Sequence, residues 1–276
     1  MSGLNHWQKA DNPIHIGSMG AGQQSSDMYI RAQLGEIQPR PFAFIFADTG
    51  NERQRVYKQL WQLSEWAISN FDNPIPILIC SNGNIYDDSL QSLEQQKTRW
   101  AGPNMYNSNS GAPIKKKCTG EYKIKPKETL IRELMKKHGF KSVIDWRGHT
   151  IDEVHRIKQD KRLYFNVRWP LAELRLRRGD CANHAEQITG INFTWSACKI
   201  CPVRCADIKS VREMKEESPE EWQEIVFFDN AARQLPGMKY ETYLNRQLVP
   251  MGDMDLSLQS DNMPSIFDCN DDTCGL

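Results

Sequence analysis

Two short runs of almost uninterrupted apolar residues constrain the fold of this 276-residue chain more than any other feature. They are Phe42–Ala47 and Ile75–Cys80, and between them Glu52–Asn70 carries apolar residues at helical spacing. A strand that is apolar on both faces fits a parallel sheet covered by helices on either side. Ile14–Ile16 begins the same alternation, with a helix expected over Ser25–Leu34. This order predicts an α/β fold with a doubly wound, mainly parallel sheet.

The remaining chain predicts smaller appended parts, because 276 residues exceed one typical domain and fall short of two. We expect an α/β domain over 1–170, a helical, cysteine-rich region over 171–235 and a weakly structured tail over 236–276. Apolar residues are sparse in 81–117, which predicts a loop or lid with one short helix near Ser89–Thr98.

Further elements are expected on both sides of residue 145. The pattern predicts helices over Lys127–His138 and Thr150–Asp160, the second with a Thr150 and Glu153 capping box, and a strand over Val143–Trp146. Another helix is expected after Ser218, where Pro219 occupies the first turn.

Charge and hydropathy restrict the partners. The chain has 35 Lys and Arg against 35 Asp and Glu, so it lacks a long-range field that would attract a nucleic acid or a membrane. A nucleic-acid substrate would need a local patch, for which Arg175, Arg177 and Arg178 with Lys115–Lys117 are the candidates. Without an apolar run of 18 residues or an export signal, we expect a cytoplasmic protein that contacts no membrane.

The glycine- and serine-rich segment Gly17–Ser26 follows the first expected strand and precedes a helix. Glycines let backbone N–H groups approach phosphate oxygens, and the helix N-terminus adds its positive end. The segment therefore predicts a phosphate site, although a tight strand-to-helix turn would have the same composition. Its candidate ligand-binding residues are Ser18, Gly20, Gly22, Gln24, Ser25 and Ser26.

Asp48, Thr49 and Gly50 end the second expected strand, at the edge of an α/β sheet where ligands bind. Asp48 is a candidate for holding Mg²⁺ on a nucleotide, with Glu52 nearby. A helix N-cap is the alternative role for this aspartate.

The cysteines make a candidate metal site. Cys198 and Cys201 have the two-residue gap that lets both sulfurs face one centre, and Cys118 and Cys181 are the preferred third and fourth ligands. Cys205 competes for the last place, and His184 is a further alternative. Four thiolates suit zinc or a 4Fe-4S cluster equally, and ordinary reduced thiols are the plainer interpretation.

Several segments together resemble the adenine nucleotide alpha hydrolases (PP-loop ATP pyrophosphatases), and especially their phosphoadenosine phosphosulfate (PAPS) reductase-like subgroup common in bacteriophages. The segments are Gly20–Ser25, Phe46–Glu52, Cys118–Pro126, Gly148–Arg156, Trp169–Leu171, Ala197–Pro202 and Pro219–Trp222. The resemblance implies a HUP/Rossmann-like fold that binds ATP with Mg²⁺, and phosphate or catalytic roles for Asp48, Lys123 and Arg156. It favours iron and sulfur over zinc. Gln24 stands where the family has an acidic residue, which weakens the case for a metal there.

Lys123 and Lys125 flank Ile124, and on an extended strand both would face the nucleotide. Surface lysines would show the same spacing.

Three functions fit the resemblance. The first is cleavage of the α,β bond of ATP, coupled to sulfur transfer or nucleic-acid modification, with a sulfur donor or a modification-complex protein as partner. The second is reduction of a sulfonucleotide, in which Cys269 or Cys274 of the tail would be redox-active. The third is an inactive nucleotide-binding subunit or sensor. The sequence leaves the acceptor open, and homodimerisation as well.

Overall fold

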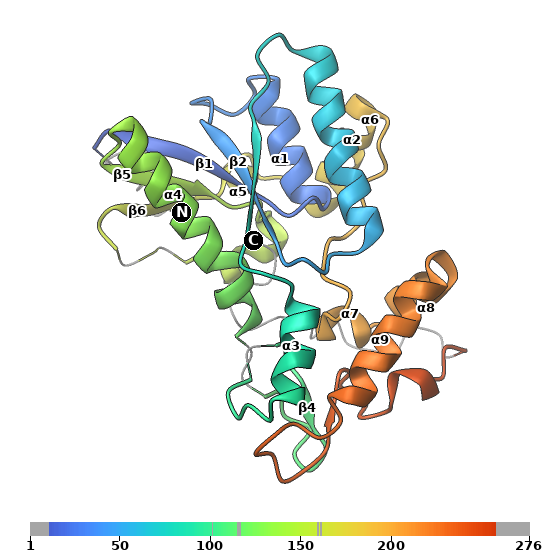
Figure 1. Ribbon diagram of the computed structural model, residues 1–276. Coiled ribbons are helices and arrows are strands. Elements are labelled where there is room, and N and C mark those ends of the chain that lie inside the picture. The colour runs from blue at the N-terminus through green and yellow to red at the C-terminus, as the bar shows by residue number, and fades with distance from the viewer. Residues whose placement is uncertain (1–10, 101, 115–116, 159, 161, 258–276) are drawn as a thin grey trace.

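The computed structural model describes residues 11–100, 102–114, 117–158, 160 and 162–257, and Figure 1 shows the arrangement of the chain. Its centre is a five-stranded parallel sheet with the order β3-β2-β1-β5-β6. The strands are β1 (Pro13–Met19), β2 (Ala43–Asp48), β3 (Ile77–Ser81), β5 (Ser142–Trp146) and β6 (Phe165–Arg168). The expected α/β fold with a parallel sheet is therefore confirmed, and β6 is a strand that the sequence pattern did not reveal.

Strand β1 lies at the centre of this sheet because two buried neighbours pair with it. Ile16 is in register with Ala43 of β2 on one side and with Asp145 of β5 on the other. The chain builds outward from β1 to β2 and β3, then returns to the opposite side of β1 for β5 and β6. The order reverses between β1 and β5, and ligands of such sheets bind at the carboxyl ends of the strands at this switch point.

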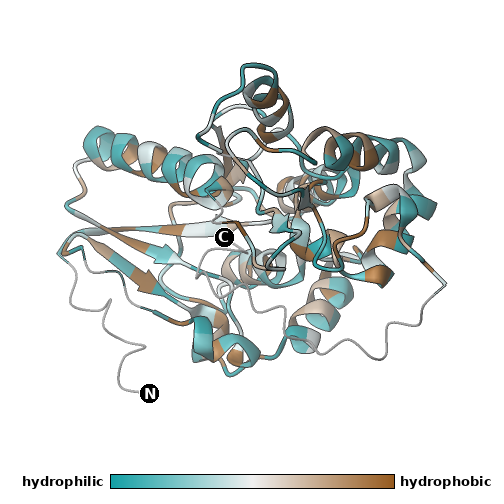
Figure 2. Cartoon of the chain, turned by 90° about the horizontal axis from the view of Figure 1, so that it is seen from below, coloured by the Kyte–Doolittle hydropathy of each residue, from teal (hydrophilic) through white to brown (hydrophobic). Residues whose placement is uncertain are grey.

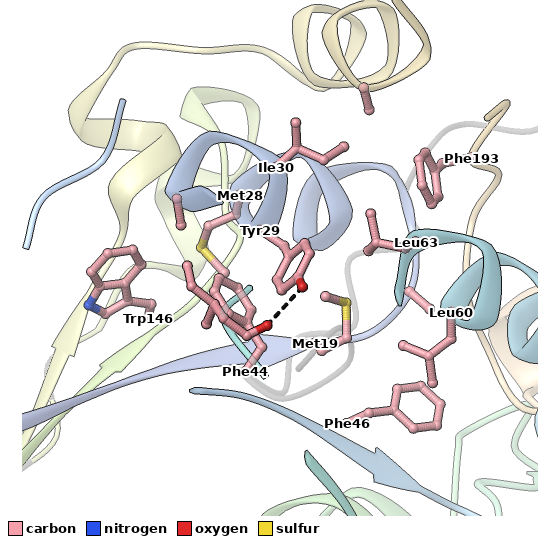
Figure 3. Packing of buried hydrophobic residues seen from close by; sticks show 14 of the residues in the cluster. Met19, Met28, Tyr29, Ile30, Phe44, Phe46, Leu60, Leu63, Trp146 and Phe193 are labelled. Atoms are coloured by element: carbon pink, nitrogen blue, oxygen red, sulfur yellow. Dashed lines mark hydrogen bonds between the residues drawn. The ribbon is translucent and has the colours of Figure 1, made fainter. Parts of the chain in front are cut away.

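One face of the sheet packs against α1 (Gln23–Gln33) and α2 (Gln54–Asn70), and α6 (Arg178–Thr189) packs against α1 in the same cluster. Figure 3 shows this cluster, in which the Tyr29 hydroxyl donates to the backbone oxygen of Ile75 at 2.8 Å. Gly17 lets the Phe44 ring lie flush against β1, because a Cβ at residue 17 would be 2.3 Å from that ring. The close packing brings β1 and the Phe44 side chain of β2 into direct contact.

Helix α4 (Lys125–His138) covers the other face, where Ile131 packs with Ile14, Ile16 and Val143. The expected extended strand over Lys123 and Lys125 is wrong, because Thr119–Ile124 forms a π-helix, η2, that runs directly into α4. Pro126 has no N–H, and its ring crowds the carbonyl four residues earlier in a regular α-helix. The wider turn avoids that crowding, and the Lys125 N–H donates to Gly120 O, five residues back.

The expected helix over Thr150–Asp160 is also shorter and of another kind. It is a 3₁₀ helix, η3 (Ile151–Arg156), and the Thr150 side chain makes no capping hydrogen bond. Both members of the expected capping box, Thr150 and Glu153, instead bond to Gln24. A tertiary contact with α1 has thus replaced the local one.

The C-terminal helices form a second cluster beside the sheet, as Figure 1 shows. Within it, α3 begins at Ile85, four residues before the expected short helix, because Asn84 caps it by accepting hydrogen bonds from the backbone N–H groups of Tyr86 and Asp87. The cluster elements are α3 (Ile85–Glu94), α7 (Pro202–Cys205), α8 (Ile208–Glu217), α9 (Pro219–Ala231), η4 (Met251–Asp253) and the two-stranded sheet of β4 (Tyr106–Asn107) and β7 (Thr242–Tyr243). The short helix α5 (Pro170–Glu173) lies beside η3.

Figure 2 shows apolar residues along the strands and hydrophilic residues over the outward sides of the covering helices. In the part of the chain that the structure describes, no helix has the length and the apolar content needed to cross a membrane.

Candidate functional site

The segment Gly20–Gly22 connects the carboxyl end of β1 to the N-terminus of α1, as the composition predicted. Ala21 adopts a φ of 56°, and the turn is held by Ser25, whose hydroxyl accepts from Gly20 N–H at 3.1 Å and donates to Gly22 O at 3.2 Å. No side chain caps α1, and its first turn contains no acidic residue. The positive end of α1 is therefore left for an anion.

Two of the expected phosphate ligands are buried instead. Ser18 donates its hydroxyl proton to Asp145 Oδ1 at 3.0 Å and accepts a hydrogen bond from Lys127. Ser26 is fully buried, and its hydroxyl oxygen has no hydrogen-bond partner among the described residues. Neither hydroxyl is presented to a ligand in this arrangement.

Gln24 joins the loop to η3. Its Nε2 donates to Thr150 Oγ1 at 3.2 Å and to Glu153 Oε2 at 2.5 Å. Glu153 also pairs with Arg156, and with Arg178 at 3.5 Å. Burial alone would raise the pKa of the Glu153 carboxyl, but the Gln24 hydrogen bond and the arginine charges outweigh burial and lower that pKa. Glu153 thus brings a carboxylate and two cations to the side of the loop.

The β5–η3 connection lies directly against the start of α1. A Cβ added at Gly148 would be 3.3 Å from the Ser25 nitrogen. An added Cβ would thus be in tight contact with the loop, which would have to shift by a few tenths of an ångström. The carboxyl ends of β1 and β5 therefore meet at one place.

Asp48 ends β2 in a defined orientation. Its Oδ1 accepts from Gly50 N–H and from the Tyr57 hydroxyl, both at 2.8 Å. Its Oδ2 makes no hydrogen bond among the described residues. The helix-cap alternative is wrong, because the N-cap of α2 is Arg53. Thr49 donates to Glu52, which is only 2 % exposed.

Glu52 connects β2 to the cysteine motif. It forms an isolated antiparallel bridge with Cys198, and Lys199 N–H donates to Asn51 O at 2.9 Å. Lys123 Nζ lies 3.6 Å from Glu52 Oε1, so η2 brings this lysine to the same place. Ser196, two residues before Cys198, touches the loop, because a Cβ at Gly22 would be 2.9 Å from its hydroxyl oxygen. One short segment thus contacts both the phosphate loop and the end of β2.

The predicted thiolate set is divided between two places. Cys198 and Cys201 share a hydrogen bond that, with burial, raises the pKa of Cys198 well above its usual value. Cys205 belongs to the C-terminal cluster, and Cys118 packs against it. Cys181 lies in the sheet cluster, where burial and neighbouring Asp27 raise its thiol pKa. Asp27 also contacts His184 at 2.5 Å.

Within the described residues, no group of three or more His, Cys, Asp or Glu side chains is placed to hold a metal ion. The set of Cys118, Cys181, Cys198 and Cys201 therefore does not surround one centre as arranged. Cys269 and Cys274 lie outside the described residues, as do Lys115 and Lys116 of the expected basic patch.

Sequence reasoning missed a buried charged group beneath the loop. Lys127 Nζ lies 2.6 Å from Asp145 Oδ1, and Arg147 Nε lies 3.1 Å from Asp145 Oδ2. The available signal was Asp145 itself, a carboxylate inside an apolar strand. Two of its partners are distant in the sequence, Ser18 by 127 residues and Lys127 by 18, so the sequence pattern did not point to them.

No protein-family model matches the sequence, and no curated protein matches it. Among solved structures, the chain is similar to the U34-tRNA thiolase NcsA from Methanococcus maripaludis with its [4Fe-4S] cluster. The TM-score is 0.38 with 10 % sequence identity, over 83 % of this chain and 74 % of that chain.

Proposed function

We propose that this chain binds an adenine nucleotide at the carboxyl ends of β1, β2 and β5, and cleaves the α,β bond of ATP to adenylate an acceptor oxygen. The observation that carries the proposal is the start of α1: an uncapped, acid-free helix N-terminus behind a glycine turn, at the switch point of a parallel sheet. Arg156 and Arg178, gathered by Glu153, add positive charge beside it.

Asp48 fits the role of the magnesium ligand. Mg²⁺ bound with a nucleotide takes one or two carboxylates plus phosphate oxygens and water. Asp48 is oriented by Gly50 and Tyr57 through one oxygen, which leaves the other for a cation. Glu52 is the weaker candidate, because its Oε1 is already bonded to Thr49 and near Lys123.

The proposed reaction has two steps. The acceptor oxygen attacks the α-phosphorus, the bond to the bridging oxygen breaks, and pyrophosphate leaves; a sulfur or nitrogen nucleophile then displaces AMP from the acceptor. The loop and the arginines hold the phosphates, and preorganised donors of this kind stabilise charge that develops on phosphate oxygens. Lys123 lies between Glu52 and the cysteine segment, where its ammonium group would balance an incoming thiolate.

The four-thiolate centre predicted from the cysteine spacing does not fit the side chains as placed, because Cys181 is in another cluster and, among the described residues, the other cysteines do not converge. No step of the proposal requires it. Cys198 and Cys201 act in the proposal only as thiols beside the nucleotide.

Release of pyrophosphate and AMP from ATP with Mg²⁺, measured with candidate acceptors, tests the proposal. Asp48→Asn should reduce the rate at least about 10-fold, because it removes the magnesium ligand. Asp72→Asn, a change at an exposed aspartate, is the matched control and should leave the rate unchanged. If the protein neither binds ATP nor releases pyrophosphate, the proposal is wrong.

Reduction of a sulfonucleotide is a second candidate, favoured by the paired thiols of Cys198 and Cys201 at the end of β2. One thiolate would attack the sulfur of an activated sulfate, breaking its bond to the phosphate oxygen, so that the nucleotide leaves and an S-sulfocysteine forms. The second thiol would then attack the cysteine sulfur, giving up its proton and closing a disulfide as sulfite leaves. Sulfite release that is lost on Cys198→Ser would support it over adenylation. ATP binding without turnover would instead support the nucleotide-binding subunit or sensor.

A further inference from the structure

Arg147 is held at the switch point by the buried ion pair of Asp145 and Lys127, which we call the platform. Asp145 is 1 % exposed and Lys127 is 5 % exposed as side chains, and their charged atoms are 2.6 Å apart. Asp145 Oδ1 also accepts from Ser18, while Oδ2 receives Arg147 Nε. Both oxygens of this carboxylate therefore have a partner, and the guanidinium is bound to it through Nε only.

The terminal nitrogens of Arg147 remain available. Among the described residues they make no hydrogen bond, and the side chain is 17 % exposed, so it lies at the boundary of the platform and solvent. A half-buried guanidinium with two unused donor groups is matched by an anion that can accept two parallel hydrogen bonds.

The net charge of Asp145, Lys127 and Arg147 together is positive, which favours the binding of an anion. Asp145 contributes one negative charge against one positive charge each from Lys127 and Arg147. Burial alone would raise the pKa of Asp145, but the two cations outweigh it and keep the carboxyl ionised. Asp160 also lies near Arg147, yet its two oxygens are bonded to Arg162 at 2.9 and 2.7 Å. One positive charge is left without a dedicated partner.

The position of Arg147 in the fold indicates which kind of anion it would bind. It directly follows β5 and precedes Gly148, whose backbone lies against Ser25 and Gln24 of the phosphate loop. We infer that Arg147 is an anion-binding residue for the polyphosphate of the nucleotide or for the released pyrophosphate, with Asp145 and Lys127 as its positioning residues. This inference rests on the proposed nucleotide site and assigns to it a cation that the sequence patterns did not reveal.

The experiment measures dissociation constants of ATP, inorganic pyrophosphate and adenosine by calorimetry, for the full chain and three variants. Arg147→Gln should weaken ATP and pyrophosphate binding about 10- to 100-fold by removing a charge-assisted hydrogen bond, and should leave adenosine binding unchanged. Arg147→Lys should recover part of the affinity, because it restores a charge but not the fork geometry. Arg132→Gln removes an arginine on α4 that is 55 % exposed and should behave like the unaltered protein.

The outcomes separate the inference from the proposed function. Unchanged ATP and pyrophosphate affinity in Arg147→Gln overturns the inference while the nucleotide site stands. An equal loss for adenosine also overturns it, since it indicates a general distortion. If the unaltered protein binds pyrophosphate through Arg147 but does not bind ATP, the proposed function fails and the anion site remains. If it binds neither, both are wrong.

Discussion

Ser18 shows which properties of a residue the sequence predicts and which only the structure reveals. Its place before a glycine turn predicted a phosphate contact, but its hydroxyl proton is donated to Asp145. The chemistry of a residue is visible in the sequence, whereas its partner is chosen by the tertiary fold. The same holds for Gln24, which stands where the family that the sequence resembles has an acidic residue. The carboxylate close to Gln24 belongs to Glu153, and only the structure shows their hydrogen bond. Residue types at the site could be predicted, and their hydrogen bonds could not.

His15 makes the first prediction, a dependence of stability on pH. It accepts a hydrogen bond from Trp146 Nε1 at Nδ1, and burial, with the charge of Arg168, lowers its pKa to about 4 from 6.5. The unfolded chain therefore takes up a proton between pH 6.5 and 4 that the folded protein refuses. The free energy of unfolding should fall as the pH falls through this window.

Denaturant titrations at several pH values between 7 and 4 measure this slope. His15→Asn keeps an acceptor without titrating, so its stability should depend less on pH than that of the unaltered protein. His155→Asn, at an exposed position, should retain the full dependence. Identical slopes for His15→Asn and the unaltered protein would contradict the prediction.

At the scale of elements, strands with buried faces were predictable because their apolar runs have no other stable placement. The helices α2 and α4 followed from helical spacing in the same way. The π-helix η2 could not be predicted, because the proline that forces it also permits an ordinary helix start. The 3₁₀ helix η3 could not either, because its expected cap is taken over by α1.

The second prediction concerns the cysteines and depends on the position of helix α6. It places Cys181 against Asp27 and apart from Cys198 and Cys201. Cys181→Ala should therefore leave any bound iron, zinc or sulfide unchanged, while Cys198→Ala should lower it. Anaerobic purification followed by metal and sulfide analysis gives the comparison. Equal losses in both variants would show that Cys181 is a ligand, and a preparation without metal would show that the sequence-based metal prediction is wrong.

At the scale of the whole molecule, two hydrophobic clusters are tied together by Arg53. This side chain, 2 % exposed, pairs with Glu221 and Glu217 at 3.1 Å and lies 5.5 Å from the Trp195 ring. Glu221 also accepts from Gln54 N–H at 2.8 Å, at the start of α2. A buried ion pair, Arg53 with Glu221, therefore lies at the join between the sheet and the C-terminal helices. The division into a sheet domain and a helical region remains a prediction.

Arg53→Met gives the third prediction. It leaves the Glu221 carboxylate buried without its partner, which should reduce the free energy of unfolding by about 3–5 kcal/mol. Arg99→Met removes an ion pair whose arginine is 71 % exposed and should cost less than about 1 kcal/mol. Both values come from denaturant unfolding. Equal effects of the two substitutions would show that Arg53 does not hold the clusters together.

The contact between Gly22 and Ser196 has a consequence for how the halves of the site communicate. The turn that would wrap a phosphate has no slack on that side, since even one added carbon would strike the Ser196 hydroxyl. Cys198 is only two residues further along the segment that Ser196 belongs to, so the turn and this thiol are close neighbours. We therefore expect the rate at which an alkylating reagent modifies the Cys198 thiol to change when a ligand occupies the turn.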